Sequence, residues 1–391
     1  MTITHAPAGE AEIADCVREA AAAGTPLEIR GGGTRLAIGR PVQTGATLSL
    51  AEHRGITLYE PGALTLVAKA GTPMAEIEAA LAAEGQQLAF EPMDHRPLLG
   101  SEGAPTIGAV VACNISGPRR VQAGACRDSL LGLRFVDGAG TVMKNGGRVM
   151  KNVTGYDLCK LLCGAYGTLG VLTEVSLKVL PAPERALTLA LRGLGPAAAV
   201  EAMAAALGSP YEVSGAAHLT DGAEGAMTLL RIEGFESQVR HRAERLCALL
   251  AGRGAVERIE GERHGALWRA VRDVEPFAGD ARAVWRLSLR PGDAPAVAAR
   301  LGDEAGADCL FDWGGGLVWA AVPEAADAHA PALRAAVAAT GGHATLVRAP
   351  AAVRAAVPVF QPEAARLADL SRALRARFDP AGVLNPGRMA A

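Results

Sequence analysis

The sequence of 391 residues has little lysine, few aromatic residues and almost no net charge. Five of its 39 basic residues are lysines, aromatic residues make up 4% of the chain, and the formal net charge is −2. A nucleic-acid-binding protein usually carries a basic domain or stripe, so this balance argues against that class. Disorder requires low hydrophobicity and high net charge, whereas 50% of these residues are hydrophobic. The chain can therefore bury a sizeable core.

Long apolar runs are also missing. No span reaches the roughly 18 uninterrupted apolar residues of a membrane-spanning helix, and the longest uncharged apolar stretch, residues 161–173, is interrupted by three glycines. The N-terminal residues do not contain a basic segment followed by an apolar one, which is the pattern of a signal peptide. We therefore expect a cytoplasmic protein without a transmembrane segment.

Cysteine occurs seven times, an odd number, and in no arrangement typical of a metal site. A large chain that is not secreted is expected to keep such residues as free thiols. Cys159 and Cys163 are spaced as on one face of a helix. No further Cys or His follows at the short spacing that a zinc or iron–sulfur site needs. We therefore predict no bound metal.

The predicted elements divide the chain into three segments, at residues 1–183, 184–348 and 349–391. At roughly 100–200 residues per domain, the length suggests two or three domains. The first segment alternates short helices and strands. The second reads strand, helix, strand, strand, helix twice, which predicts a duplicated α+β unit with an antiparallel sheet and its helices on one side. The third ends on FDPAGVLNPGRM, whose apolar residues indicate that it docks onto another part of the fold.

The clearest candidate for a binding site is RGGGT at residues 30–34, directly after a predicted strand. Successive glycines let several backbone N–H groups point to one spot, where they bind phosphate oxygens without a charged side chain. A flexible turn is the simpler interpretation of three glycines alone. The loop is not a Rossmann fingerprint, because Leu36 stands where the third glycine belongs, and the chain contains no G-K-[ST] of a P-loop.

Two further stretches are rich in small residues. Residues 108–117 contain Asn114, Ser116 and Gly117, and their small side chains permit close approach of a large flat ligand. Residues 164–171, GAYGTLGV, form a glycine turn that leads into a strand. Tight packing and a plain helix-to-strand connection are the alternatives for each stretch alone, so the interpretation depends on the combination.

The order and spacing of four stretches resembles the FAD-binding fold of the vanillyl-alcohol oxidase (PCMH-type) flavoprotein family. These stretches are IRGGGTRL, TIGAVVACNISGPRR, KNVTGYDLCKLLCGAYGTLGVLTEVSLKVLP and FDPAGVLNPGR. The resemblance covers about residues 1–183 and 350–391. It implies an α+β protein with a PCMH-type FAD-binding domain of two α+β subdomains at 1–183. An α+β cap or substrate-type domain at 184–348 follows, and the segment 349–391 returns to the FAD domain.

The resemblance also implies which residues bind FAD. One group wraps the pyrophosphate, a second lines the phosphates and the flavin ring, a third holds the adenosine end, and the tail closes over the flavin. In that order they are Arg30, Gly31, Gly32, Gly33 and Thr34; Thr106, Gly108, Asn114, Ser116 and Gly117; Gly167, Gly170 and Val171; and Asn385 and Pro386. Some relatives attach FAD covalently through a histidine after the first glycine pair. Thr34 stands there, so we expect non-covalent FAD.

Within that family, three stretches look most like the FAD-binding subunits of bacterial glycolate oxidases, also called glycolate dehydrogenases. They are residues 149–180, 117–120 and 311–319, the last reading FDWGGGLVW, for which ordinary hairpin core is the simpler interpretation. Such enzymes oxidise glycolate, a small 2-hydroxy acid, to glyoxylate. The resemblance thus implies two partners, a larger flavin subunit and an iron–sulfur subunit, and through them a peripheral position at the inner membrane.

One motif of the related 2-hydroxy-acid dehydrogenases is missing. They carry a late H-x-G-D-G-N-x-H-like motif whose histidines serve a metal or act as a base, and no two of the eight histidines here lie two residues apart. A base that works near neutral pH is most often histidine, and His343 is a candidate by position only. We therefore assign no catalytic residue.

Three hypotheses for the function stay open. The chain is an FAD-binding subunit that passes electrons to partner subunits, a self-sufficient FAD-dependent 2-hydroxy-acid dehydrogenase, or a non-catalytic scaffold subunit without flavin. The intact glycine stretches argue against the third hypothesis. The missing histidine motif favours the first over the second.

Overall fold

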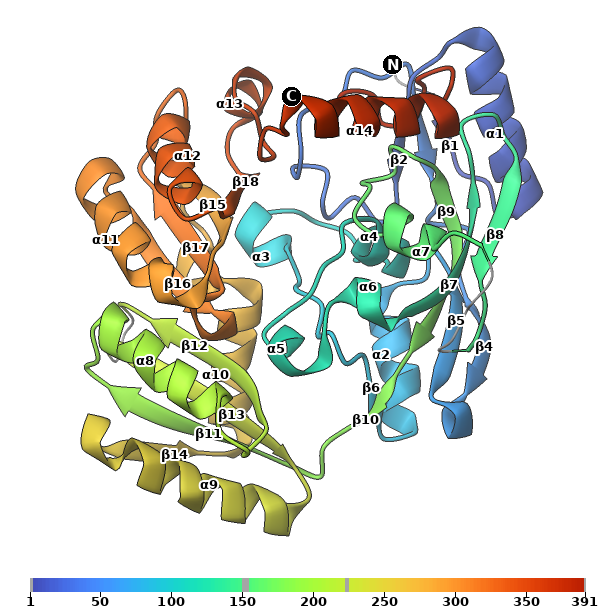
Figure 1. The fold of residues 1–391 in the computed structure, drawn as a ribbon. Helices are drawn as coiled ribbons and strands as arrows, with labels where there is room; N and C mark the ends of the chain where they lie inside the picture. Colours follow the sequence, from blue (N-terminus) through green and yellow to red (C-terminus); the bar gives the residue numbers. More distant parts are fainter. Residues whose placement is uncertain (1–2, 150–154, 222–224, 390–391) are drawn as a thin grey trace.

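The computed structural model describes residues 3–149, 155–221 and 225–389. Figure 1 shows two groups of elements side by side, each with its own sheet system. The first group holds a buried core that includes Ile13, Leu48, Phe135 and Val175, and the second a core that includes Leu189, Leu230 and Trp285. The division at residues 183 and 348 stays a prediction, and the two separate cores are compatible with it.

A small parallel sheet begins the first group. Its strands, in spatial order, are β1 (Ile3–His5), β3 (Ala46–Ser49) and β2 (Leu27–Arg30). Helix α1 (Glu10–Ala23) covers it with the apolar face expected from its sequence, and Gly24 ends the helix in the left-handed conformation, with a φ of 61°. Strand β2 therefore runs directly into the RGGGT loop, as the sequence predicts.

A five-stranded antiparallel sheet completes the first group. Its strands, in spatial order, are β4 (Ile56–Glu60), β5 (Thr65–Lys69), β9 (Val171–Lys178), β7 (Leu130–Val136) and β8 (Val142–Gly146). Four short helices pack with it: α2 (Met74–Ala83), α4 (Ile107–Ala112), α6 (Cys126–Ser129) and α7 (Leu158–Leu162). Helices α3 (Arg96–Leu99) and α5 (Arg120–Ala123) lie instead toward the second group (Figure 1). Strands β6 (Gln86–Gln87) and β10 (Leu180–Pro181) pair where the chain leaves this group.

The second group is built on one eight-stranded antiparallel sheet. In spatial order its strands are β14 (Val256–Ile259), β11 (Arg185–Arg192), β13 (Met227–Gly234), β12 (Val213–Leu219), β16 (Asp308–Asp312), β17 (Leu317–Val322), β15 (Ala283–Ser288) and β18 (His343–Arg348). The two halves of the sheet meet where β12 pairs with β16. Each half contains a strand, a helix, two strands, a helix and a strand in that order along the chain.

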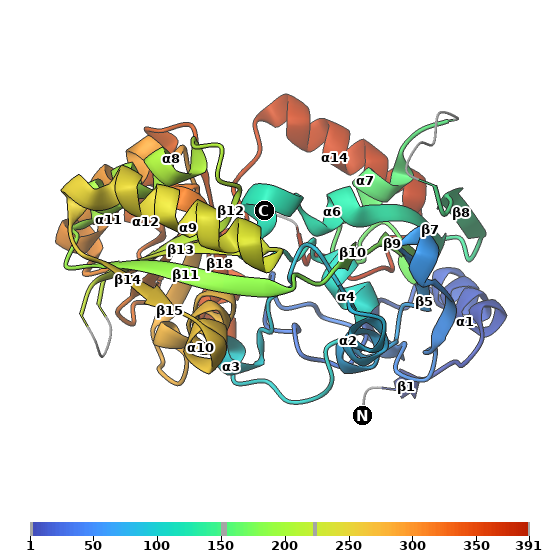
Figure 2. The same ribbon diagram turned by 90° about the horizontal axis from the view of Figure 1, so that it is seen from below.

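The four helices of the predicted duplicated unit lie on one side of this sheet, as expected, and a further helix outside that unit lies on the other side. One face is covered by α8 (Pro196–Leu207), α9 (Glu236–Leu250), α11 (Ala294–Ala305) and α12 (Ala330–Ala338). Helix α10 (Gly261–Asp273) packs Trp268 and Val271 against Ala190 and Leu229 on the other face, and Figure 2 shows it on the opposite side from α9. The same face also receives Met93 from the first group. This second face is therefore the junction between the two groups.

The C-terminal segment returns to the first group. Helices α13 (Ala351–Ala356) and α14 (Ala365–Phe378) lead to a tail that forms a parallel bridge between Leu384 and Leu27 of β2. The Leu27 amide donates to the Val383 carbonyl at 2.8 Å, and both Val383 and Leu384 are buried. Val383 and Leu384 of the tail thus pack beside β2 of the first group.

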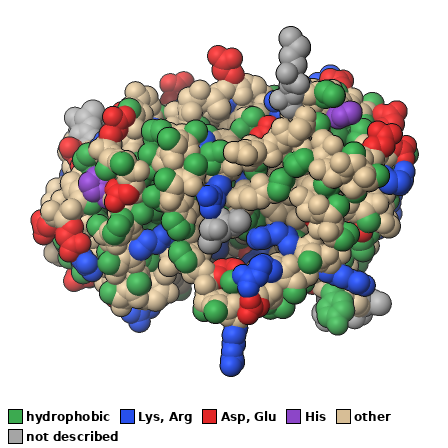
Figure 3. All heavy atoms as spheres, turned by 90° about the horizontal axis from the view of Figure 1, so that it is seen from above, with side chains coloured by type: hydrophobic (Ala, Val, Ile, Leu, Met, Phe, Trp, Pro, Cys, Tyr) green, Lys and Arg blue, Asp and Glu red, His purple; other side chains and the backbone are tan. Residues whose placement is uncertain are grey.

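Seen from above, the molecule has a hollow near the middle of the face, and Lys and Arg side chains lie around it (Figure 3). No helix within residues 3–149, 155–221 and 225–389 combines the length and the apolar character needed to cross a membrane.

Candidate cofactor site

A cavity lies where the RGGGT loop, helix α4, the turn before β9 and the C-terminal tail meet. Nine of the 15 residues that the sequence assigns to FAD line it: Arg30, Gly31, Gly33, Thr34, Thr106, Gly108, Gly167, Gly170 and Asn385. These residues come from stretches far apart in the sequence. The structure therefore brings together parts of all four stretches that carry the family resemblance.

Close backbone contact explains the first two glycines of the loop. A Cβ on Gly31 would lie 2.1 Å from Oγ1 of Thr106, and a Cβ on Gly32 would lie 1.8 Å from the carbonyl oxygen of Ala104. The left-handed conformation belongs to Gly33, whose φ is 80°. The glycines thus let the loop lie directly on residues 104–106, of which Thr106 lines the cavity.

Small residues also let α4 and the turn before β9 pack closely against residues of the five-stranded sheet or next to it. The Gly108 amide donates to the Ala70 carbonyl at 2.8 Å, and a Cβ on Gly108 would lie 2.6 Å from the Ala70 Cβ. Gly167 has a φ of 70°, and a Cβ on Gly170 would lie 2.7 Å from the Phe135 ring. Larger side chains at these positions would fill space beside the cavity.

The tail is tied to the cavity by Asn385. Its Oδ1 accepts from the Ile29 amide at 2.9 Å, and its Nδ2 donates to the Tyr166 carbonyl at 2.9 Å. Both neighbours line the cavity, and Asn385 itself is 3% exposed. One side chain therefore joins strand β2 to the glycine turn before β9.

We expect Asn385→Ala to lower both stability and FAD retention. The change leaves the Ile29 amide and the Tyr166 carbonyl without partners, and each buried unpaired group costs about 1–3 kcal/mol. Thermal unfolding and the flavin content of purified protein measure the two effects. Arg377→Gln, on the exposed part of α14, is the control and should leave both unchanged. Full flavin content in Asn385→Ala would contradict the prediction.

Five of the residues assigned to FAD do not line this cavity: Gly32, Asn114, Ser116, Gly117 and Val171. Asn114 and Ser116 instead accept hydrogen bonds from the amides of Arg127 and Cys126. Pro386 also lies outside the cavity wall, as does the exposed His343 at the start of β18. Asn114 and Ser116 therefore hold the start of α6 rather than the wall itself.

Sequence reasoning missed two arginines in the wall. Burial, and then Arg35, lower the pKa of His95 well below its ordinary value, so its neutral Nδ1 accepts from Arg35 Nε at 3.3 Å. Arg35 is 8% exposed. Arg388 contacts Glu28 at 3.3 Å and donates to the Ile38 carbonyl at 2.9 Å. A lone arginine after a glycine loop gives no sequence signal of such a role.

Three buried polar atoms of the cavity residues have no hydrogen-bond partner among the described residues. They are Nη1 of Arg35, Oγ1 of Thr106 and Nε of Arg388. Buried donors are almost always paired, so unpaired ones that line a cavity indicate a ligand that accepts hydrogen bonds. Two guanidinium groups favour an anionic ligand. The residues present therefore fit a phosphate-bearing cofactor such as FAD.

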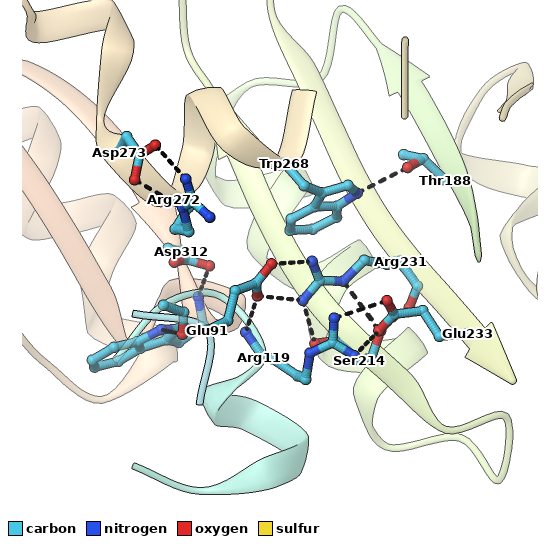
Figure 4. Close-up of polar contacts among 12 residues, drawn as sticks. Glu91, Arg119, Thr188, Ser214, Arg231, Glu233, Trp268, Arg272, Asp273 and Asp312 are labelled. Atoms are coloured by element: carbon cyan, nitrogen blue, oxygen red, sulfur yellow. Dashed lines mark hydrogen bonds and ion pairs between the residues drawn. The ribbon is translucent and has the colours of Figure 1, made fainter. Parts of the chain in front are cut away.

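A second polar cluster lies at the junction of the two groups (Figure 4). Arg231 on β13 binds Glu91 through two hydrogen bonds of 2.8 Å, and Arg119 binds Glu233 on β13 at 2.8 and 3.0 Å. Burial alone would raise the pKa of Glu91, but the nearby arginines, Arg231 first, outweigh it and lower that pKa. Both ion pairs therefore join the two groups: in one the arginine belongs to the second group, and in the other the arginine belongs to the first.

The FDWGGGLVW stretch lies at the same junction. It forms the hairpin of β16 and β17, but its Trp313 also donates from Nε1 to the Gly117 carbonyl at 3.0 Å. Burial raises the pKa of the preceding Asp312 to about 7. The stretch is therefore both a hairpin and a contact between the two groups.

Comparison with known proteins gives relatives of this fold. Residues 2–146 match the family model of the FAD binding domain. The chain is 39% identical over 375 residues to glycolate oxidase subunit GlcE of Escherichia coli (strain K12), which is 95% of this chain and 95% of that protein. It is 33% identical over 165 residues to glycolate oxidase subunit GlcD of Bacillus subtilis (strain 168), which is 42% of this chain and 34% of that protein.

Solved structures share the fold at low sequence identity. A 4-ethylphenol oxidase from Gulosibacter chungangensis matches with a TM-score of 0.71 and 17% identity, over 99% of this chain and 88% of that one. An alkyldihydroxyacetonephosphate synthase matches with a TM-score of 0.68 and 16% identity, over 98% of this chain and 76% of that one. The α+β FAD-binding fold expected from the sequence is confirmed.

Proposed function

Because the chain belongs to the family of FAD-binding oxidoreductase subunits that includes glycolate oxidase subunit GlcE, we propose that it is the FAD-binding subunit of a multi-subunit 2-hydroxy-acid oxidase. Glycolate is the substrate and glyoxylate the product. The electrons pass through FAD to a larger flavin subunit and an iron–sulfur subunit. The chain is then cytoplasmic, and any position at the inner membrane depends on those partners.

One observation carries the cofactor part of this proposal. The glycine-lined cavity has three buried polar atoms without partners, on Arg35, Thr106 and Arg388. We assign the FAD phosphates to these groups and to the backbone of residues 31–34. Thr34 offers no nucleophilic ring nitrogen, so FAD binds without a covalent link.

The remaining residues of the cavity shape and close the site. Gly108, Gly167 and Gly170 keep the wall thin enough for a flat ring system, and Asn385 holds the tail across one end. FAD, when bound, supplies the two-electron acceptor for the hydrogen on the α-carbon of the hydroxy acid. The chain's contribution is to bind and orient both molecules and to exclude water from between them.

We expect the isolated FAD-loaded chain to be reduced slowly by 2-hydroxy acids. Oxidation requires removal of the hydroxyl proton, and a positioned base contributes about 10²–10⁴-fold to such transfers. No histidine lines the cavity within the described residues. Anaerobic rapid mixing with glycolate and with D-lactate measures the rate of flavin bleaching.

The same experiment distinguishes the alternatives. Fast, stoichiometric bleaching without any partner would overturn the subunit proposal and favour a self-sufficient FAD-dependent 2-hydroxy-acid dehydrogenase. A chain that purifies colourless and takes up no added FAD would favour the scaffold without flavin. Slow bleaching that accelerates when partner subunits are added is the result we expect.

A further inference from the structure

Two arginines without partners lie over one indole ring at the junction. Arg120 begins α5 in the first group, and Arg286 lies on β15 in the second. Their guanidinium carbons are 4.5 and 5.1 Å from the centroid of the Trp313 ring. Within the described residues, neither guanidinium has a hydrogen-bond or ion-pair partner.

The neighbouring arginines at the junction each have a carboxylate partner within the chain. Arg119 is paired with Glu233 and Arg231 with Glu91, each through two hydrogen bonds. Arg120 follows Arg119 directly in the chain and still lacks such a partner. Both side chains are half-buried, and none of their nitrogens is among the fully buried unpaired atoms, so the two guanidiniums are open to an anion from outside the chain.

The charges around the pair leave it positive. Burial lowers the pKa of Arg286, and the charge of Arg120 lowers it further, whereas Tyr166 and Asp312 act in the opposite direction. Burial raises the pKa of Asp312 to about 7, and its carboxyl group accepts from the Trp313 amide. Asp312 therefore offsets the two guanidinium charges only in part.

The pair lies toward Tyr166 of the cavity wall, although none of Arg120, Arg286 and Trp313 lines the cavity itself. Tyr166 lines the cavity and is near enough to Arg286 for their charges to interact. Trp313 is fixed by its hydrogen bond to the carbonyl of Gly117, three residues before Arg120. An anion held between the two guanidiniums would thus contact both groups of elements, on the side toward Tyr166.

We propose that Arg120 and Arg286 bind the carboxylate of the small 2-hydroxy acid, with Trp313 as the residue that positions both guanidiniums. A guanidinium donates two parallel hydrogen bonds to a carboxylate, and an aromatic face fixes the plane of the fork. This inference rests on the proposed function, because it takes the substrate class from it. It adds that the acid binds on this chain, whether or not the chain oxidises it rapidly alone.

Binding of oxalate to the FAD-loaded full chain tests the inference. Oxalate carries the carboxylate groups but has no hydrogen to transfer, so titration calorimetry reports binding without turnover. We expect Arg286→Gln and Arg120→Gln each to weaken oxalate binding about tenfold or more, and Arg286→Lys to weaken it because the ammonium lacks the fork. Arg290→Gln, an exposed residue paired with Asp293, is the matched control and should bind as the wild type does.

The outcomes separate this inference from the proposed function. Wild-type affinity in Arg286→Gln and Arg120→Gln overturns the site while leaving the proposed function intact. A wild-type FAD-loaded chain that binds neither oxalate, glycolate nor D-lactate overturns both the site and the assignment of substrate to this chain. Loss of FAD together with oxalate in Arg286→Lys also counts against the site, because it would show a structural role instead. Retained FAD with weakened oxalate binding in all three variants supports it.

Discussion

A protein in which valine replaces Gly32 is expected to purify with less than about a tenth of the wild-type FAD content. The Cβ would lie 1.8 Å from the carbonyl oxygen and 2.8 Å from the carbonyl carbon of Ala104, and both are backbone atoms that cannot move as a flexible side chain can. Overpacking of this kind forces the backbone to shift. The loop at residues 30–34 would then separate from residues 104–106, and the cavity wall that they share would be lost.

The ratio of flavin absorbance to protein absorbance measures this effect directly. Gly62→Val is the matched control, because Gly62 belongs to the same group of elements and a Cβ there meets nothing within 4 Å. Circular dichroism of both variants shows whether the rest of the fold survives. Full flavin occupancy in Gly32→Val would show that the loop does not form the cofactor site.

The position of Gly32 also shows where sequence reasoning was incomplete. Each of the three glycines could adopt a positive φ, but only the third, Gly33, does so. Gly32 does not line the cavity and is required because residues 103–106 pack on it. A contact between segments about 70 residues apart leaves no local pattern, so the packing role of Gly32 is not visible in the sequence.

The second group of elements was predicted well because its strands and helices have clear apolar periods. The predicted order of strand, helix, strand, strand and helix is observed twice, starting at β11, Arg185–Arg192, and again at β15, Ala283–Ser288. Strand β14, Val256–Ile259, was missed because only its two ends are apolar in VERI and it pairs at the edge with β11 alone. An amphipathic period locates a helix but does not tell which face of the sheet it covers, as α10 shows.

Polar contacts across the junction were the least predictable part of the candidate sites. Glu91 and Arg231, which form one ion pair, are 140 residues apart in the sequence. Arg35 is recognised as a cavity residue only from its contact with His95 and its place in the cavity wall. A charged residue in a sequence is most often solvated, so nothing local distinguishes these side chains from the other arginines of the chain. Their burial and the paired hydrogen bonds between guanidinium and carboxylate groups identify them only once the fold is known.

The largest loss of stability is expected from Glu91→Gln. Arg231 is 2% exposed at its side chain and would keep only Glu233, 3.4 Å away and shared with Arg119, as a charged partner. Breaking a buried ion pair by changing one member costs about 3–5 kcal/mol. The Trp268 ring, 4.5 Å from the guanidinium carbon, keeps Arg231 from turning toward water. Denaturant unfolding at neutral pH measures the change in the free energy of unfolding.

Acid should have the same effect on the wild type. The pKa of Glu91 is lower in the folded chain than its ordinary value of 4.5, so its contribution is complete above that value and is lost as the pH falls through the folded pKa. The stability of Glu91→Gln should therefore fall less than that of the wild type between neutral pH and the acid range. Glu304→Gln, which breaks an exposed pair with Arg300, is the control and should cost about 1 kcal/mol or less. Equal losses in Glu91→Gln and Glu304→Gln would show that the two ion pairs at the junction do not hold the two groups together.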